Sequence, residues 1–127
     1  MPGCLQVLEQ LKNKRYKLFL ISNGFVEIQH LKLQRTGLAA YFERCYFSEQ
    51  VGAHKPSKVF FDYAIKSSNA IKKQSLVLGD NFEADIVGAK NAGIDQVYFN
   101  PNPSTEPLPF NPKFHIKNLR ELVQIVD

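Results

Sequence analysis

Two aspartates are placed where they could bind a hard divalent cation. Asp80 directly follows the run 75–79, which reads as a strand, and Asp85 comes five residues later, in the first turns of the helix expected next. Mg²⁺ prefers oxygen ligands and needs only one or two protein carboxylates when a phosphate supplies others. The competing interpretation is that Asp80 caps the helix and Asp85 merely favours its positive N-terminal end.

A polar turn follows the first long apolar run of the sequence. Ser22, Asn23 and Gly24 come directly after the run 18–21 and precede an expected helix. A hydroxyl beside the free backbone amides of a helix N-terminus can hold a phosphate or an oxyanion. An ordinary helix cap and turn is the alternative for this motif.

A single lysine lies in the loop His54-Lys55-Pro56, between an expected strand and an expected helix. The ammonium group of Lys55 is a compact point charge that can pair with a phosphate and restrain a nucleophilic carboxylate. Read alone, Lys55 is better explained as a solvated loop lysine. His54 could contact a substrate, but an imidazole without a special role is the simpler interpretation.

Alternating strands and helices position these residues. Strands are predicted at 17–22, 45–48, 75–79, 96–99 and 114–116, and helices at 3–14, 25–34, after Pro56, from 80–81 to about 91–93, and after Asn118. Apolar runs that suit burial on both faces, alternating with helices, indicate an α/β fold with a parallel sheet. Ligands of such sheets bind at the carboxyl ends of the strands. We therefore expect Ser22, Lys55, Asp80 and Asp85 to converge at that edge.

The composition is that of one small globular domain. The 127 residues are 44% hydrophobic and 22% charged, and the run 18–21 is far shorter than the roughly 20 residues that span a bilayer. The net charge is +4, but Tyr16 is the only aromatic residue within the basic clusters, too few for a stacking platform, so a nucleic acid is not expected as a partner. A membrane is not expected either, because no apolar run is long enough. Cys4 and Cys45 lack metal or redox spacing and no signal peptide is visible, which predicts reduced thiols and a cytoplasmic location.

Three segments together resemble a known family. The segments 18–24 (LFLISNG), 55–56 (KP) and 79–94 (GDNFEADIVGAKNAGI) occur in the order of motifs two, three and four of the haloacid-dehalogenase-like (HAD) hydrolase superfamily. The resemblance runs from about residue 2 to 127. The sequence of the last motif is most similar to that of the branch containing 5′-nucleotidases and phosphoglycolate-phosphatase-like enzymes. It implies the C-terminal part of a three-layer, Rossmann-like parallel core.

The resemblance also implies a mechanism and residue roles. In this family an aspartate attacks the phosphorus of a phosphorylated small molecule and forms an aspartyl-phosphate, with Mg²⁺ as cofactor. Carried over by motif, Ser22, Asn23 and Gly24 would bind the phosphoryl oxygens. Lys55 would bind phosphate and balance the charge of the nucleophile, Asp80 would bind Mg²⁺, and Asp85 would support both Lys55 and the metal site.

The sequence departs from the family pattern at the first motif. The family has an apolar strand ending in Asp-x-Asp, followed by a cap domain, and no Asp-x-Asp occurs anywhere in this chain. We therefore expect residues 1–127 to be a partial catalytic core without the first strand, the nucleophile and the cap. Such a fragment would be inactive alone and would bind Mg²⁺ weakly or not at all.

Two alternatives to a hydrolase fragment differ in what the chain would do. The chain could be a non-catalytic phosphate-binding or regulatory module derived from the same fold. A receiver-like signalling domain is excluded by chain order, because it needs an acidic pair near its N-terminus.

A missing first strand would leave a slot between the strands near 18–22 and 76–79. Each buried backbone group without a partner costs about 1–3 kcal/mol, and an open apolar edge invites pairing with another chain. The slot could be closed by direct pairing of the two strands, by a second copy in a homodimer, or by a strand-completing partner. Dimerisation or rearrangement is the expectation favoured from the sequence.

Overall fold

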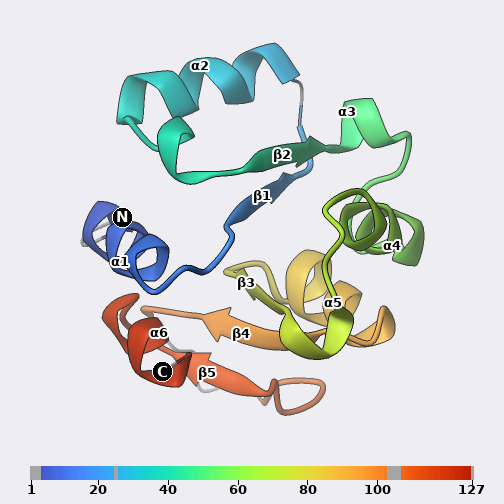
Figure 1. Cartoon of the computed structure of the whole chain (residues 1–127). Coiled ribbons are helices and arrows are strands. Elements are labelled where there is room, and N and C mark those ends of the chain that lie inside the picture. Colours follow the sequence, from blue (N-terminus) through green and yellow to red (C-terminus); the bar gives the residue numbers. More distant parts are fainter. Residues whose placement is uncertain (1–3, 25, 103–106, 127) are drawn as a thin grey trace.

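Parallel strands with helices between them build the molecule (Figure 1). The computed structural model describes residues 4–24, 26–102 and 107–126. The strands are β1 (Phe19–Ser22), β2 (Arg44–Phe47), β3 (Leu76–Gly79), β4 (Asp95–Phe99) and β5 (Phe114–Ile116). The longer helices are α1 (Cys4–Asn13), α2 (Val26–Thr36), α4 (Lys58–Ser67) and α6 (Arg120–Ile125), and the short helices are α3 (Ser48–Val51) and α5 (Gly88–Asn91). The predicted α/β class is confirmed.

The strands form two parallel sheets. β1 pairs with β2, and Ser22 lies opposite Phe47 at the end of that ladder. The other sheet has the order β3-β4-β5, with Gly79 opposite Tyr98. Within the described part of the chain no ladder joins β1 to β3. Direct pairing of these two strands, one of the rearrangements anticipated from the sequence, does not occur.

Helices cover both faces of the three-stranded sheet. Val77 and Val97 point to opposite faces because Val97 lies opposite Leu78, the neighbour of Val77, in the β3–β4 register. On the Val97 face, a buried cluster joins α1 and α6 to β4 and β5 through Val7, Leu11, Val97, Ile116, Leu119 and Leu122. On the Val77 face, a second cluster joins α4 and α5 to β3 through Phe61, Val77, Ala89, Ala92 and Ile94. This arrangement is the helix–sheet–helix layering expected of a Rossmann-like core.

The face of the sheet that carries Val97 is sparsely covered over β3, because Leu76 and Leu78 point to that face. Leu76 and Leu78 are 37% and 38% exposed, although strands of parallel α/β sheets are normally covered on both faces. Ile21 of β1 packs against the cluster that contains Val77, and no ladder joins β1 to β3 among the described residues. The missing central strand itself stays a prediction.

Helix ends follow the local sequence. Ser57 caps α4 by accepting a hydrogen bond from the Val59 amide at 3.2 Å. At α6 the Asn118 side chain accepts from the Arg120 amide at 2.9 Å, and Glu121 accepts in return from the Asn118 amide at 2.9 Å. These reciprocal bonds resemble a capping box, although the N-cap residue of α6 is Leu119, one position after Asn118, and its side chain makes no capping hydrogen bond. Among the described residues, no helix is both long and apolar enough to cross a membrane.

Two elements differ from the sequence-based prediction. The strand predicted to reach Ser48 ends at Phe47, and Ser48 instead begins α3, which ends at Gly52 in the left-handed conformation (φ 79°). The helix predicted after Asp80 begins as a π-helix (Phe82–Val87) and continues as α5. π-Helical segments are rare and are frequent at functional sites, and this one carries Asp85.

Candidate functional site

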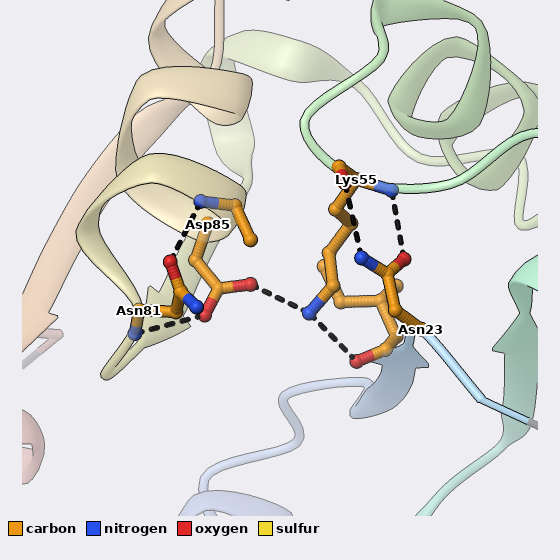
Figure 2. Close-up of polar contacts among 6 residues, drawn as sticks. Asn23, Lys55, Asn81 and Asp85 are labelled. Carbon is orange, nitrogen blue, oxygen red and sulfur yellow. Dashed lines mark hydrogen bonds and ion pairs between the residues drawn. The ribbon is translucent and has the colours of Figure 1, made fainter.

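An ion pair between Lys55 and Asp85 lies at the centre of the site (Figure 2). The Lys55 Nζ atom is 2.6 Å from Asp85 Oδ1, and the two side chains are only 11% and 7% exposed. Nζ also donates to the carbonyl oxygen of Ile21 at 3.4 Å. The lysine charge is thereby held between the end of β1 and the π-helix that follows β3. This distance satisfies the convergence expected of Lys55 and Asp85.

The turn after β1 is fastened to the lysine loop by the side chain of Asn23. Its Nδ2 donates to the Lys55 carbonyl oxygen at 3.0 Å, and its Oδ1 accepts from the Lys55 amide at 2.8 Å (Figure 2). A side-chain amide that satisfies both the donor and the acceptor of one residue fixes that residue's backbone. The sequence suggested only a phosphate role for Asn23, so this clamp is a finding of the structure.

Asn81 holds Asp85 from the other side. The Asn81 amide donates to Asp85 Oδ2 at 3.3 Å, and the Asn81 side chain accepts from the Ala84 amide at 2.9 Å. The Asp85 amide in turn donates to the Asn81 carbonyl oxygen at 2.9 Å. Both carboxylate oxygens of Asp85 therefore have partners, one from Lys55 and one from Asn81.

Two glycines allow the close approaches on which this arrangement depends. A Cβ atom added at Gly79 would overlap the side chain of Asp85, so only glycine leaves room for that carboxylate beneath the end of β3. A Cβ atom at Gly88 would overlap the Phe61 ring and lie 3.0 Å from the Cα atom of Pro56. Neither glycine was singled out as a site residue from the sequence, although both fall in the segment 79–94 that carried the family resemblance.

The remaining predicted residues lie at the same edge in different environments. Ser22 is the half-buried last residue of β1. The Gly24 amide donates to Ser48 Oγ at 3.1 Å, so this amide is already engaged within the protein. Asp80 is exposed directly after β3.

Of the two aspartates at this edge, only Asp80 is well suited to bind a metal ion directly. In the described ranges, no group of three or more His, Cys, Asp or Glu residues is close enough to hold a metal ion. Asp80, an exposed carboxylate at the mouth of the sheet, has the chemistry of an Mg²⁺ ligand. Asp85 fits a direct ligand role less well, because Lys55 and Asn81 occupy its oxygens.

Comparison with known proteins gives consistent matches. The model of a family described as haloacid dehalogenase-like hydrolase matches residues 1–99. The pyrimidine 5′-nucleotidase YjjG of Escherichia coli is 35% identical over 127 residues, which cover 99% of this chain and 56% of that protein. The pyrimidine 5′-nucleotidase PynA of Streptococcus pneumoniae is 30% identical, covering all of this chain and 54% of that protein.

A solved structure has the same fold. The magnesium-bound structure of the putative hydrolase YfnB from Bacillus subtilis superposes with a TM-score of 0.94 at 28% identity, covering all of this chain and 56% of the other. The chain thus spans about half the length of the curated relatives it matches.

Proposed function

Because the chain belongs to the haloacid dehalogenase-like hydrolase family, we propose that it forms part of the core of a phosphohydrolase that cleaves phosphate monoesters through an aspartyl-phosphate. The family resemblance seen in the sequence is confirmed. The observation that carries the proposal is the buried Lys55–Asp85 pair at the carboxyl edge of β1 and β3, where α/β sheets bind ligands.

Each residue of this edge has a role in the proposal. The Ser22 hydroxyl donates a hydrogen bond to a phosphoryl oxygen beside the Asn23–Gly24 turn. Lys55 places a positive charge next to the phosphoryl group and the attacking carboxylate, and Asp85 and Asn23 hold it there. Fixed charges that need no reorganisation during the reaction are an effective way to stabilise a transition state.

Asp80 is the residue that would hold Mg²⁺. When bound, the metal supplies positive charge to the phosphoryl oxygens and helps to align them for attack. In this proposal Asp85 contributes to the metal site indirectly, through Lys55 and the Asn81 turn. Mg²⁺ needs only one or two protein carboxylates when a phosphate is also present, and Asp80 would be the one that this chain provides.

The nucleophile has to be supplied by a strand other than the five described. The chain contains no Asp-x-Asp, and burial raises the pKa of the Cys45 thiol, which disfavours a thiolate nucleophile there. An apolar strand between β1 and β3, parallel to both, would end at the same edge as Ser22 and Gly79. A carboxylate at its end would then lie near the Lys55 ammonium.

The partner that completes the fold follows from this requirement. A second copy of the chain could cover the exposed edge of β3, but it would bring no Asp-x-Asp. We therefore assign the catalytic strand to a different segment or polypeptide, and residues 1–127 to a partial core domain. The chain alone is expected to be inactive and to bind Mg²⁺ weakly.

A non-catalytic phosphate-binding module is the second candidate. The sequence feature that favours it is the absence of Asp-x-Asp. This module would bind phosphate at Ser22–Gly24 in the same way, but no added strand would confer turnover on it.

Phosphate binding and turnover by the purified chain test the proposal. Titration with inorganic phosphate should shift the NMR amide signals of Ser22, Asn23 and Gly24, and Lys55→Met should weaken this binding. The chain with Mg²⁺ should not hydrolyse p-nitrophenyl phosphate, because nothing supplies the nucleophile. Hydrolysis by the chain alone that is abolished by Asp80→Ala would contradict the assignment of the nucleophile to another strand.

A further inference from the structure

A cavity lies beside β2, apart from the proposed phosphate site. Its volume of about 520 Å³ falls within the roughly 300–1,000 Å³ of ligand sites. Residues 42–46 line it in succession, and Leu33 of α2, Val51 of α3 and Tyr63 of α4 line it from the neighbouring helices. None of the residues proposed to bind phosphate or Mg²⁺ is part of this lining. The cavity is therefore built by a different set of residues from the proposed catalytic edge.

The cavity follows the unpaired edge of β2. Within the described ranges β2 has a ladder only with β1, and Figure 1 shows α2 on the side of β2 that faces away from β1. Because Leu33 of α2 lines the cavity together with residues 42–46, the cavity lies along that open edge. An unpaired strand edge presents amide and carbonyl groups to which another strand can bond. The four residues of β2 span about 13 Å, the length of a short extended peptide.

Apolar and aromatic side chains frame this edge. Leu33 is buried, whereas Tyr63 is 47% exposed and its ring centroid lies 5.9 Å from that of Tyr46 in an edge-to-face contact. When a peptide adds a strand to a sheet edge, its main chain supplies the hydrogen bonds and its alternate side chains enter the flanking pockets. An exposed aromatic ring beside an open edge offers a contact of this kind. The frame therefore favours a peptide with apolar side chains at alternate positions.

One positive charge is held in place at the edge. The Arg44 guanidinium carbon lies 5.8 Å from the Tyr46 ring centroid, and an Arg44 Nη atom donates to Ser67 Oγ at 2.9 Å. Among the described residues no carboxylate forms an ion pair with Arg44. The neighbouring Glu43 is exposed, and within the same ranges its side chain makes no hydrogen bond or ion pair, so it can turn toward water. The fixed charge of Arg44 therefore favours an acidic side chain in the partner.

From these contacts we infer that the open edge of β2 binds an extended peptide as an additional strand, with an acidic side chain against Arg44 and apolar side chains at the neighbouring positions. The inference is independent of the proposed function. A second copy of this chain fits the edge less well. The cavity has ten lining residues, whereas a stable dimer needs about 20–30 residues a side. Each copy also carries a net charge of +4, which opposes self-association.

Two matched pentapeptides test the inference on the whole chain, an acetylated Val-Glu-Val-Glu-Val amide and its Val-Lys-Val-Lys-Val counterpart. In NMR titrations at about 0.15 M salt, where distant charges are largely screened, the acidic peptide should shift the amides of residues 42–46 and Tyr63 but not those of Ser22–Gly24. It should bind at least roughly threefold more tightly than the basic peptide, the effect of one exposed ion pair. Arg44→Gln should remove most of this preference. Arg120→Gln, which changes the net charge equally on α6 outside the cavity, should retain it.

N-methylated peptides test the main-chain contacts. A strand turns the N–H groups of alternate residues toward the same neighbour, so N-methylation of one alternate set should block pairing with β2 while methylation of the other set should not. The acidic peptide methylated at its Val residues and the same peptide methylated at its Glu residues should therefore differ in affinity by at least roughly tenfold, because two or three hydrogen bonds are lost in only one of them.

Several results would overturn the inference. The acidic peptide could leave the amides of residues 42–46 unshifted, the two N-methylated peptides could bind equally well, or the preference for the acidic peptide could survive Arg44→Gln. If light scattering showed that the chain alone forms a dimer, with concentration-dependent shifts at residues 42–46, the edge would belong to a second copy and the inference would be equally wrong. None of these results bears on the proposed phosphate site, which is tested separately at Ser22–Gly24.

Discussion

Lys55 Nζ lies 2.6 Å from Asp85 Oδ1, although 30 residues separate the two in sequence. The pair joins the loop before α4 to the π-helix after β3, and Asn23 and Asn81 fix it from either side (Figure 2). Both side chains are nearly buried, so neither charge is well solvated if its partner is lost. The pair is therefore important for stability as well as for the proposed chemistry.

Removing one member of this pair should destabilise the protein strongly. Lys55→Met leaves the Asp85 carboxylate buried without its cation, and Asp85→Asn leaves Lys55 without its anion. Each single change should lower the free energy of unfolding by about 3–5 kcal/mol, the usual cost of breaking a buried ion pair. Urea unfolding of both variants measures this cost.

The double variant provides the control for that measurement. With both charges removed, the loss should be clearly smaller than the sum of the two single losses. Additive losses would mean that the two residues stabilise the fold independently, contrary to the observed geometry.

Gly79→Ala should disturb the position of Asp85. The new methyl group would overlap the Asp85 side chain, and relief of overlaps of this kind typically costs about 1–3 kcal/mol. We expect a lower unfolding free energy and, in a crystal structure of the variant, a Lys55–Asp85 distance longer than in the parent. Leu78→Ala on the same strand is the control, because Leu78 is 38% exposed and its truncation should leave that distance unchanged. An unchanged distance in Gly79→Ala would show that the close approach is not needed.

Asn23→Ala should loosen the lysine loop without unfolding the protein. The change removes the two hydrogen bonds to the Lys55 backbone, each worth about 0.5–1.5 kcal/mol. Amide hydrogen exchange at Lys55 should become faster, while exchange in β4 stays slow. Asn23→Asp retains the acceptor for the Lys55 amide but not the donor to its carbonyl, so its effect should be intermediate. Equal exchange at Lys55 in all three proteins would contradict the clamp.

Asp62 should contribute to stability in a pH-dependent way. Hydrogen bonds from Lys58 and Lys72, each 2.9 Å from an Asp62 carboxylate oxygen, hold the pKa of this carboxyl below its usual range. Because the folded pKa lies below the unfolded one, the contribution is present above the unfolded pKa and is lost as the pH falls through the folded pKa. The pair with Lys58 is well exposed, so the contribution should be at most about 1 kcal/mol.

Comparison of the parent with Asp62→Asn measures this contribution. In urea unfolding, the parent should have a slightly larger free energy of unfolding than Asp62→Asn near neutral pH. This difference should vanish in strong acid. If the difference in unfolding free energy grew as the pH falls, the lowered pKa of Asp62 would be contradicted.

Much of the fold could be predicted because its signals are local. The apolar runs ending at Ser22 and Gly79 identified parallel strands, although the burial expected on both faces is not found, because β1 is half-buried and Leu76 and Leu78 of β3 are exposed. Helix starts were expected after Pro56 and Asn118, where α4 and α6 begin. The clamp between Asn23 and Lys55 could not be predicted in this way, since it joins residues 32 positions apart. The close approach at Gly79 likewise depends on where the π-helix places Asp85, and no periodicity in the sequence indicated a π-helix.

The separation of the two sheets was the least predictable feature. The sequence indicated that a strand of the family pattern is missing, but several ways of closing the slot remained open. In the structure β1 keeps its ladder with β2, Ile21 packs against the cluster that contains Val77, and no ladder joins β1 to β3 in the described part of the chain. Such packing depends on tertiary contacts that no local pattern encodes.

Complementation by an added strand tests the central claim most directly. The chain should be mixed with Mg²⁺, p-nitrophenyl phosphate and a synthetic peptide consisting of an apolar strand of about six residues that ends in Asp-x-Asp. The account predicts turnover that requires the peptide, is absent with the matched Asn-x-Asn peptide, and is lost in Lys55→Met. It would be contradicted if the Asp-x-Asp peptide conferred no turnover, or if hydrolysis proceeded equally without any peptide.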